Sequence, residues 1–259
     1  PKDFDSLLYT SQILQGIAIK YGVEHWRRHR GRCMGAIYWQ LNDCWPVASW
    51  SSIDYFGRWK ALHYFAKRFF APVLLSAKEE GTGVDLYLSN EKMEPVSGKV
   101  VWKLRSNTSE VIKEGSVQVD VPALSSTLCE SLDFSDILKD KKSKMKTYLE
   151  FSFLQDGKTV SSGTVIFTKD KYFEYLDPAI KTEVKETEDA FIIQVQSKAF
   201  ARYVELDLEN ADCKFSDNYF DLSACEPKEI IVKKDSLSSN MNLQLFSESL
   251  KVRSIYDIA

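Results

Sequence analysis

The sequence predicts a mainly β protein in which two immunoglobulin-like β-sandwiches follow a helix–strand–helix segment. Near Pro72 the spacing of hydrophobic residues changes from about 3.6 residues to about 2. Five of the six tryptophans and all three histidines precede residue 64, so the composition changes at the same place. Beyond it lie two sets of short β-patterned runs separated by turn residues. We therefore expect three parts, at residues 1–71, 72–170 and 171–259.

The first part begins with a predicted helix over residues 4–30. Its apolar side chains recur at spacings of three, four and seven, which predicts one stripe facing the core, formed by Leu7, Leu14, Ile17, Ala18, Tyr21 and His25. The continuous apolar run at 33–39 is typical of a parallel strand buried on both faces. A second helix is predicted over 58–70, after a loop.

Each later part has the strand content of one small sandwich. The first set of predicted strands is 73–77, 84–89, 98–105, 111–119, 128–134, 146–155 and 159–167. The second set is 180–185, 190–196, 201–208, 213–215, 228–233, 242–246 and 250–257. Seven short strands in about 100 residues indicate an immunoglobulin-like sandwich. The basic run at 139–144 is predicted to be a solvated loop between strands.

Charge and cysteine content exclude several classes of function. Thirty-four basic against 37 acidic side chains give a net charge of −3, so neither a nucleic acid nor a membrane partner is expected. The five cysteines form no C-x-x-C pair and the histidines form no ligand motif, so we expect no metal ion and no cofactor. Reduced cysteines favour the cytoplasm, with lysosomal and secreted locations left open. The first residues resemble neither a signal peptide nor an initiator Met, so the natural beginning is expected to be missing.

The segment at 39–55 has the strongest chemical character. It combines three tryptophans with two aspartates, an asparagine and several hydroxyls. Sugar sites use such a mixture, because a pyranose has apolar faces that stack on indole and hydroxyls that need polar partners. The alternative is that these tryptophans only pack, as large aromatic residues commonly do.

Three stretches of this region resemble a known family: MGAIYWQLNDCWP at 34–46, SWSSIDY at 49–55 and GRWKALHYF at 57–65. They closely resemble the end of the catalytic barrel in β-mannosidases of glycoside hydrolase family 2. The run FSDNYFDL at 215–222 is similar to the last β-sandwich of those enzymes. The resemblance implies that residues 1–71 are the last helix–strand–helix part of a TIM (β/α)8 barrel, which needs roughly 250 residues to close.

The resemblance also implies a function. The chain would be the carboxyl-terminal portion of a retaining exo-glycosidase that releases terminal β-D-mannose, with a mannoside or mannooligosaccharide as substrate. Both catalytic glutamates of the family would precede Pro1, on the amino-terminal remainder of the same protein, so no catalytic residue is expected here. Retaining hydrolysis needs two carboxyl groups roughly 5 to 5.5 Å apart. Asp43 and Asp54 are not expected to replace them, and the chain alone should be inactive.

By resemblance, Trp39 is the hydrophobic platform beneath the terminal mannose. Asn42 and Asp43 would hydrogen-bond the sugar or fix the loop, and for Asp43 the fixing role is favoured. Trp45 and Trp50 are expected to pack.

A second class of function remains open: a non-catalytic carbohydrate-binding or interaction module in which the sandwiches do the work. The predicted strands show aromatic clusters only at 172–175 and 219–220, which weakens this alternative. The sequence upstream of Pro1 would discriminate between the two.

Overall fold

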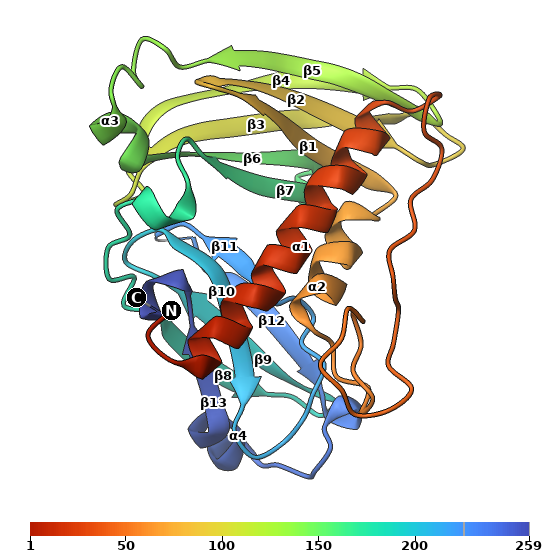
Figure 1. Cartoon of the computed structure of the whole chain (residues 1–259), viewed down its shortest axis with the longest axis vertical. Coiled ribbons are helices and arrows are strands. Elements are labelled where there is room, and N and C mark those ends of the chain that lie inside the picture. The colour runs from red at the N-terminus through yellow and green to blue at the C-terminus, as the bar shows by residue number, and fades with distance from the viewer. Residues whose placement is uncertain (225, 259) are drawn as a thin grey trace. The chain divides into compact units, whose positions relative to one another are not determined.

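The computed structural model describes residues 1–224 and 226–258, and it is mainly β, with few helices (Figure 1). The described chain forms two compact units. The first sandwich unit consists of residues 19–37 and 67–175. The second sandwich unit consists of 1–18, 38–66 and the chain from Leu176 onward. Residues 1–71 are therefore shared between the two units.

All seven predicted strands of the first sandwich are present. They are β1 (Val73–Glu80), β2 (Gly83–Asn90), β3 (Val96–Ser106), β4 (Val111–Val121), β5 (Ser125–Asp133), β6 (Thr147–Gln155) and β7 (Lys158–Ile166). One sheet has the order β1-β2-β5 and the other β4-β3-β6-β7, and every paired strand is antiparallel. The predicted immunoglobulin-like arrangement of short antiparallel strands is confirmed for this part.

The core of this sandwich is filled by side chains that alternate inward along the strands. Leu86, Phe153 and Trp102 are among its buried members. The Trp102 ring lies across Gly115 of the neighbouring strand, where a Cβ atom would come within 2.5 Å of the indole. The indole nitrogen donates a hydrogen bond to Glu130 at 2.8 Å, so its polar edge is satisfied.

The basic run predicted to be a loop contains a short helix, α3 (Lys141–Met145). Its first turn is closed by Asp140, whose carboxylate accepts a hydrogen bond from the Ser143 amide at 2.7 Å. The Ser143 hydroxyl lies against the Asp140 backbone in return, which completes a capping box. Asp140 and Ser143, which are three residues apart in the sequence, were the signal for the start of a helix. The run of basic residues around them favoured the prediction of a loop instead.

The second sandwich contains β8 (Lys181–Glu186), β9 (Ala190–Gln196), β10 (Ala201–Leu208), β11 (Phe220–Leu222), β12 (Lys228–Lys233) and β13 (Leu250–Arg253). Its sheets have the orders β12-β9-β8 and β11-β10-β13. The strand predicted at 213–215 is reduced to one bridge between Phe215 and Val232. β11 was not predicted as a strand.

The strand predicted at 242–246 is wrong, because this segment begins helix α4 (Leu243–Ser249). The Asn242 side chain caps it by accepting a hydrogen bond from the Leu245 amide at 2.9 Å. Phe246 is fully buried and stacks on Phe191 with the ring centroids 4.2 Å apart. Short 3-10 helices occupy Asp170–Tyr172, Lys234–Ser236 and Ile255–Ile258.

Both long predicted helices exist, as α1 (Phe4–Arg28) and α2 (Ala61–Phe69), but α1 buries a different face from the predicted one. The buried residues along α1 are Ser6, Tyr9, Ile13, Gly16, Val23 and Glu24. Leu7, Leu14 and Tyr21 of the predicted stripe are exposed. The helix carries two apolar stripes, and the spacing alone does not say which one is covered. None of the described helices is long and apolar enough to span a membrane.

The strand predicted at 33–39 is also wrong: this segment has no strand structure in the described chain. Ile37 is 98% exposed and Met34 is 66% exposed. A buried parallel strand is held by hydrogen bonds to neighbours on both sides. The described residues offer no strand that pairs with this one, which is the physical reason for the difference.

Candidate functional site

The aromatic loop, residues 40–60, joins the extended segment after α1 to α2. Its backbone folds back on itself through hydrogen bonds from the Ser52 amide to the Gln40 carbonyl at 3.0 Å and from Ile53 to Leu41 at 2.8 Å. The end of the loop is joined to the same backbone, because the amide of Lys60 donates a hydrogen bond to the Ser52 carbonyl at 2.9 Å. The loop is therefore an ordered structure held by its own hydrogen bonds.

The Asp43 carboxylate is the point at which the side-chain hydrogen bonds of the aromatic loop meet. Its side chain is buried and accepts hydrogen bonds from the hydroxyls of Ser49 and Ser51, the latter at 2.6 Å. The Lys60 ammonium lies 3.2 Å from the same carboxylate and donates to the Ser51 hydroxyl at 2.7 Å. The hydrogen bonds from Ser49 and Ser51, with the charge of Lys60, hold the pKa of Asp43 below its usual value. Asp43 occupies the loop-fixing position in this geometry.

A second set of hydrogen bonds lies around Ser52, which is fully buried. Its hydroxyl donates to the Leu41 carbonyl at 3.0 Å and contacts the hydroxyl of Tyr38 at 2.8 Å and Nδ1 of His63 at 3.0 Å. Burial lowers the pKa of His63, which favours the neutral ring. His63 therefore links α2 to the loop.

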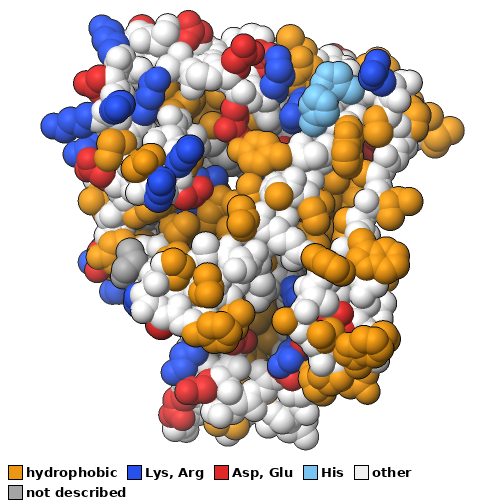
Figure 2. All heavy atoms as spheres, viewed as in Figure 1, with side chains coloured by type: hydrophobic (Ala, Val, Ile, Leu, Met, Phe, Trp, Pro, Cys, Tyr) orange, Lys and Arg blue, Asp and Glu red, His pale blue; other side chains and the backbone are white. Residues whose placement is uncertain are grey.

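Three indoles, those of Trp39, Trp45 and Trp50, face solvent. Trp39 is 71% exposed, Trp45 63% and Trp50 68%, and Figure 2 shows hydrophobic side chains gathered at the surface over this loop. The expectation that Trp45 and Trp50 pack is wrong for the described chain, because neither ring is covered in it. The backbone at Trp50 is nevertheless anchored, since its carbonyl accepts a hydrogen bond from Gln15 of α1 at 2.8 Å.

The three predicted substrate-binding residues thus have two different environments. Trp39 and Asn42 are exposed, whereas Asp43 is buried. The side-chain amide nitrogen of Asn42 donates to the backbone carbonyl of Asp43 at 3.1 Å. The peptide bond that joins Trp39 to Gln40 is cis.

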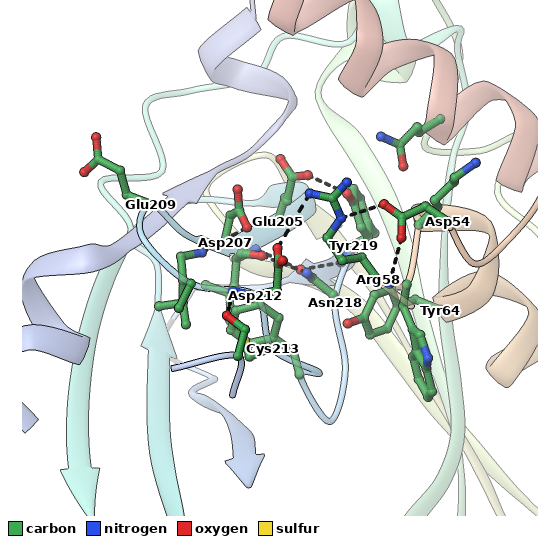
Figure 3. A pocket seen from close by; sticks show the side chains of 18 of the residues that line it. Asp54, Arg58, Tyr64, Glu205, Asp207, Glu209, Asp212, Cys213, Asn218 and Tyr219 are labelled. Carbon is green, nitrogen blue, oxygen red and sulfur yellow. Dashed lines mark hydrogen bonds and ion pairs between the residues drawn. The ribbon is translucent and has the colours of Figure 1, made fainter. Parts of the chain in front are cut away.

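An acidic cleft of about 720 Å³ lies in the second sandwich unit between the end of the aromatic loop and the strand β10. Figure 3 shows Arg58 lying between Asp54 and Asp212 in this cleft. The Arg58 Nε is 2.5 Å from the Asp54 carboxylate, and an Nη atom is 3.7 Å from that of Asp212. Asp54 also accepts hydrogen bonds from the amides of Phe56 and Arg58, so both of its oxygens are occupied within the loop.

The wall of the cleft formed by β10 is also acidic. Glu205 accepts hydrogen bonds from the Tyr219 hydroxyl and from Arg253, which is paired with Asp5 as well. Burial and the adjacent Glu205 raise the pKa of Tyr219, so its hydroxyl stays protonated. Burial likewise raises the pKa of Asp207, on the same strand.

Sequence reasoning missed this cleft. Its signal was the succession Glu205, Asp207 and Glu209 at alternate positions, which places three carboxylates along one face of β10 and its continuation. Among the described residues, no group of three or more His, Cys, Asp or Glu side chains is arranged to hold a metal ion.

Comparisons with known families agree with the observed fold. Residues 82–172 match a family described as the mannosidase Ig/CBM-like domain, and residues 175–258 match an Ig-fold domain family. The two sandwiches are therefore immunoglobulin-like domains of the mannosidase type.

The chain is also similar to complete β-mannosidases. It is 31% identical to a β-mannosidase of Bos taurus over 233 residues, and 32% identical to one of Mus musculus over 243 residues. These matches cover 84% and 85% of this chain but 26% of each relative, so the chain spans about a quarter of their length.

Solved structures are also similar to this chain. A β-D-mannosidase from Dictyoglomus thermophilum superposes with a TM-score of 0.86 at 26% identity, over 98% of this chain and 30% of that one. An exo-chitosanase from Amycolatopsis orientalis, at 14% identity and a TM-score of 0.68 over 94% of this chain and 33% of that one, shares the fold. The resemblance to β-mannosidases carried by the sequence motifs is confirmed.

Proposed function

We propose that this chain is the carboxyl-terminal portion of a retaining exo-β-mannosidase and that residues 1–71 complete its catalytic barrel. The similarity to β-mannosidases over most of the chain supports the parent activity. The observation that supports a sugar-binding role for this portion is the exposed indole of Trp39. Trp39 immediately precedes the aromatic loop, which buried Asp43 holds in place. A large exposed apolar surface on an ordered support marks a place of contact.

In this proposal the chain binds and positions sugar but breaks no bond. The Trp39 indole offers an apolar face to the C–H face of a terminal mannose, and the side-chain oxygen of Asn42 accepts a hydrogen bond from a sugar hydroxyl. Asp43 keeps the loop in place through Ser49, Ser51 and Lys60. Both carboxylates that perform the double displacement lie in the amino-terminal remainder.

The proposal is tested by Trp39→Ala in the longer protein, with an aryl β-mannoside as substrate. Loss of the stacking surface should lower kcat/KM at least about tenfold, since an aromatic contact contributes roughly 0.5 to 1.5 kcal/mol beyond its buried area. The matched control is Trp45→Ala, which removes a similarly exposed indole from the aromatic loop that follows Trp39 and should change kcat/KM less than about twofold. A Trp39→Ala enzyme with normal kcat/KM and a lowered Tm would show that Trp39 is a packing residue.

A further inference from the structure

Ser52 makes hydrogen bonds to the chain on both sides of Trp39. Its backbone amide donates to the Gln40 carbonyl at 3.0 Å and to the Leu41 carbonyl at 3.2 Å. Its hydroxyl donates to the Leu41 carbonyl at 3.0 Å and contacts the Tyr38 hydroxyl at 2.8 Å. Ser52 is fully buried, whereas the indole of Trp39 is exposed. The course of the backbone through Trp39 therefore depends on one buried serine.

His63 of α2 is the third partner of the Ser52 hydroxyl, with its Nδ1 at 3.0 Å. The imidazole ring is itself packed against the ring of Trp59, with the two centroids 4.3 Å apart. The residues on either side of His63, Leu62 and Tyr64, are buried. His63 thus connects the serine to a helix whose neighbouring side chains lie in the core.

The number of hydrogens at the Ser52 hydroxyl sets the direction of its three contacts. A serine hydroxyl has one hydrogen to donate and two lone pairs that accept. A carbonyl oxygen can only accept, so this hydrogen points to Leu41. The Tyr38 hydroxyl and the His63 ring then both donate to the Ser52 oxygen. Burial, together with the charge of Lys214, lowers the pKa of His63 and favours the neutral ring, so Nδ1 carries the hydrogen and Nε2 carries none.

We propose that His63, as the Nδ1–H tautomer, is a positioning residue for sugar binding, which holds Ser52 and, through Ser52, the orientation of the Trp39 indole. His63 touches no sugar and acts only through Trp39. The inference rests on the proposed function, because it takes Trp39 as the platform for a terminal mannose. The region then has two supports with separate tasks, since Asp43 holds the later part of the aromatic loop and the Ser52–His63 pair orients the indole.

The test compares two amide substitutions at His63 in the longer protein, with an aryl β-mannoside as substrate. Asparagine places an N–H donor at the same number of bonds from the backbone as Nδ1, whereas glutamine places it at the number of bonds of Nε2. His63→Gln should lower kcat/KM about fivefold or more, roughly the effect of losing one hydrogen bond. His63→Asn keeps the donor and should stay within about twofold of the unmodified enzyme.

The two substitutions are matched controls for each other, because both remove the ring contact with Trp59. Their difference therefore reports the position of the donor. The reverse order of activities, or an equal loss in both variants, would overturn the proposal.

A double-mutant cycle with Trp39→Ala separates positioning from general stability. Because His63 acts through the indole, His63→Gln should change kcat/KM by less than about twofold once Trp39 is replaced by alanine. An equal loss with and without the indole would show that His63 supports the protein in another way, and would overturn the proposal. If Trp39→Ala lowers kcat/KM and His63→Gln does not, only the positioning role is overturned. Normal kcat/KM in Trp39→Ala would overturn the proposed function, and the positioning role with it.

The tautomer is measured independently on the unmodified 259-residue chain, from the ¹⁵N NMR signals of the His63 ring at about pH 8, where the ring is neutral. The expected result is a hydrogen on Nδ1 and a lone pair on Nε2. A hydrogen on Nε2 would overturn the proposal, because Nδ1 could then only accept from Ser52. This measurement needs no substitution, so it decides even if His63→Gln fails to fold. In that case Ser52→Ala, which removes the shared hydroxyl, takes its place in the cycle.

Discussion

Asp43 shows how one buried carboxylate supports an exposed aromatic surface. Its oxygens accept hydrogen bonds from Ser49 and Ser51 and pair with Lys60, three residues from the later part of the aromatic loop. Charge-assisted hydrogen bonds of this kind are stronger than neutral ones. The order of the loop therefore depends on the ionised form of a residue that is itself hidden from a ligand.

This dependence predicts a specific effect of pH on stability. The pKa of Asp43 is lowered in the folded chain from the usual 3.8, so its ionised form stabilises the fold above that value. That contribution is lost as the pH falls through the lowered pKa. Asp43→Asn should lower Tm at pH 7, and the difference from the unmodified chain should shrink below about pH 4. A difference in Tm that is constant from pH 7 to pH 3 would contradict this role of the charge.

A residue of the second sandwich allows a comparable test of α4. The Asn242 side chain accepts a hydrogen bond from the Leu245 amide, so Asn242→Ala should cost about 0.5 to 2 kcal/mol of stability. Asn240→Ala is the matched control, since Asn240 is exposed and precedes the cap. Urea denaturation of the two variants measures the effect, and equal midpoints would argue against a capped helix at 243–249.

At the scale of elements, α1 presents two apolar stripes, and its glycines show which one is covered. Gly16 lies against Phe65 of α2, and an added Cβ would come within 2.7 Å of that ring. The Phe65 ring is buried and has little room to move. Gly22, on the same helix, has its nearest such contact at 3.6 Å, from Trp26.

The two glycines should respond in opposite directions to the same change. Gly16→Ala should destabilise the chain by about 1 to 3 kcal/mol, the usual cost of overpacking. Gly22→Ala should stabilise it by about 0.5 to 1 kcal/mol, because alanine favours a helix over glycine where there is space. Chemical denaturation of both variants tests the packing, and a stabilising Gly16→Ala would contradict the contact with Phe65.

Elements that follow from the pattern of residues along their own segment could be predicted. Features that depend on contacts with residues distant in the sequence could not. The seven strands of the first sandwich follow from alternation and turn residues. The covered face of α1 depends on Phe65 and Tyr203, which are distant in sequence. Helix α4 is selected by the Asn242 cap and the Phe191–Phe246 stack over a segment that alternates like a strand.

The candidate site likewise has features that could be predicted from the sequence and features that could not. The composition of residues 39–55, together with the resemblance to a known family, singled out Trp39, Asn42 and Asp43 from the sequence. The burial of Asp43 under its serine and lysine partners required the fold, because these partners lie six to seventeen residues away. The acidic cleft depends on Arg58 meeting Asp212 across 154 residues of chain, which no local pattern encodes.

At the scale of the whole molecule, the chain combines two complete sandwiches with a segment whose expected strand is unformed. The sandwiches match families of immunoglobulin-like domains, whereas residues 33–39 are exposed or half-buried and form no strand in the described chain. The aromatic loop is ordered and both of its aspartates are occupied by hydrogen bonds within it. A free pair of carboxylates suited to glycoside cleavage is thus missing from the loop.

The most direct test of this account is an aryl β-mannoside assay of the purified 259-residue chain beside a longer protein that includes the amino-terminal remainder. We predict no turnover by the chain alone and turnover by the longer protein, because the proposed function places the catalytic carboxylates outside the chain. Turnover by the chain alone that survives further purification and disappears in Asp43→Ala would contradict it, since catalysis would then reside in the aromatic loop.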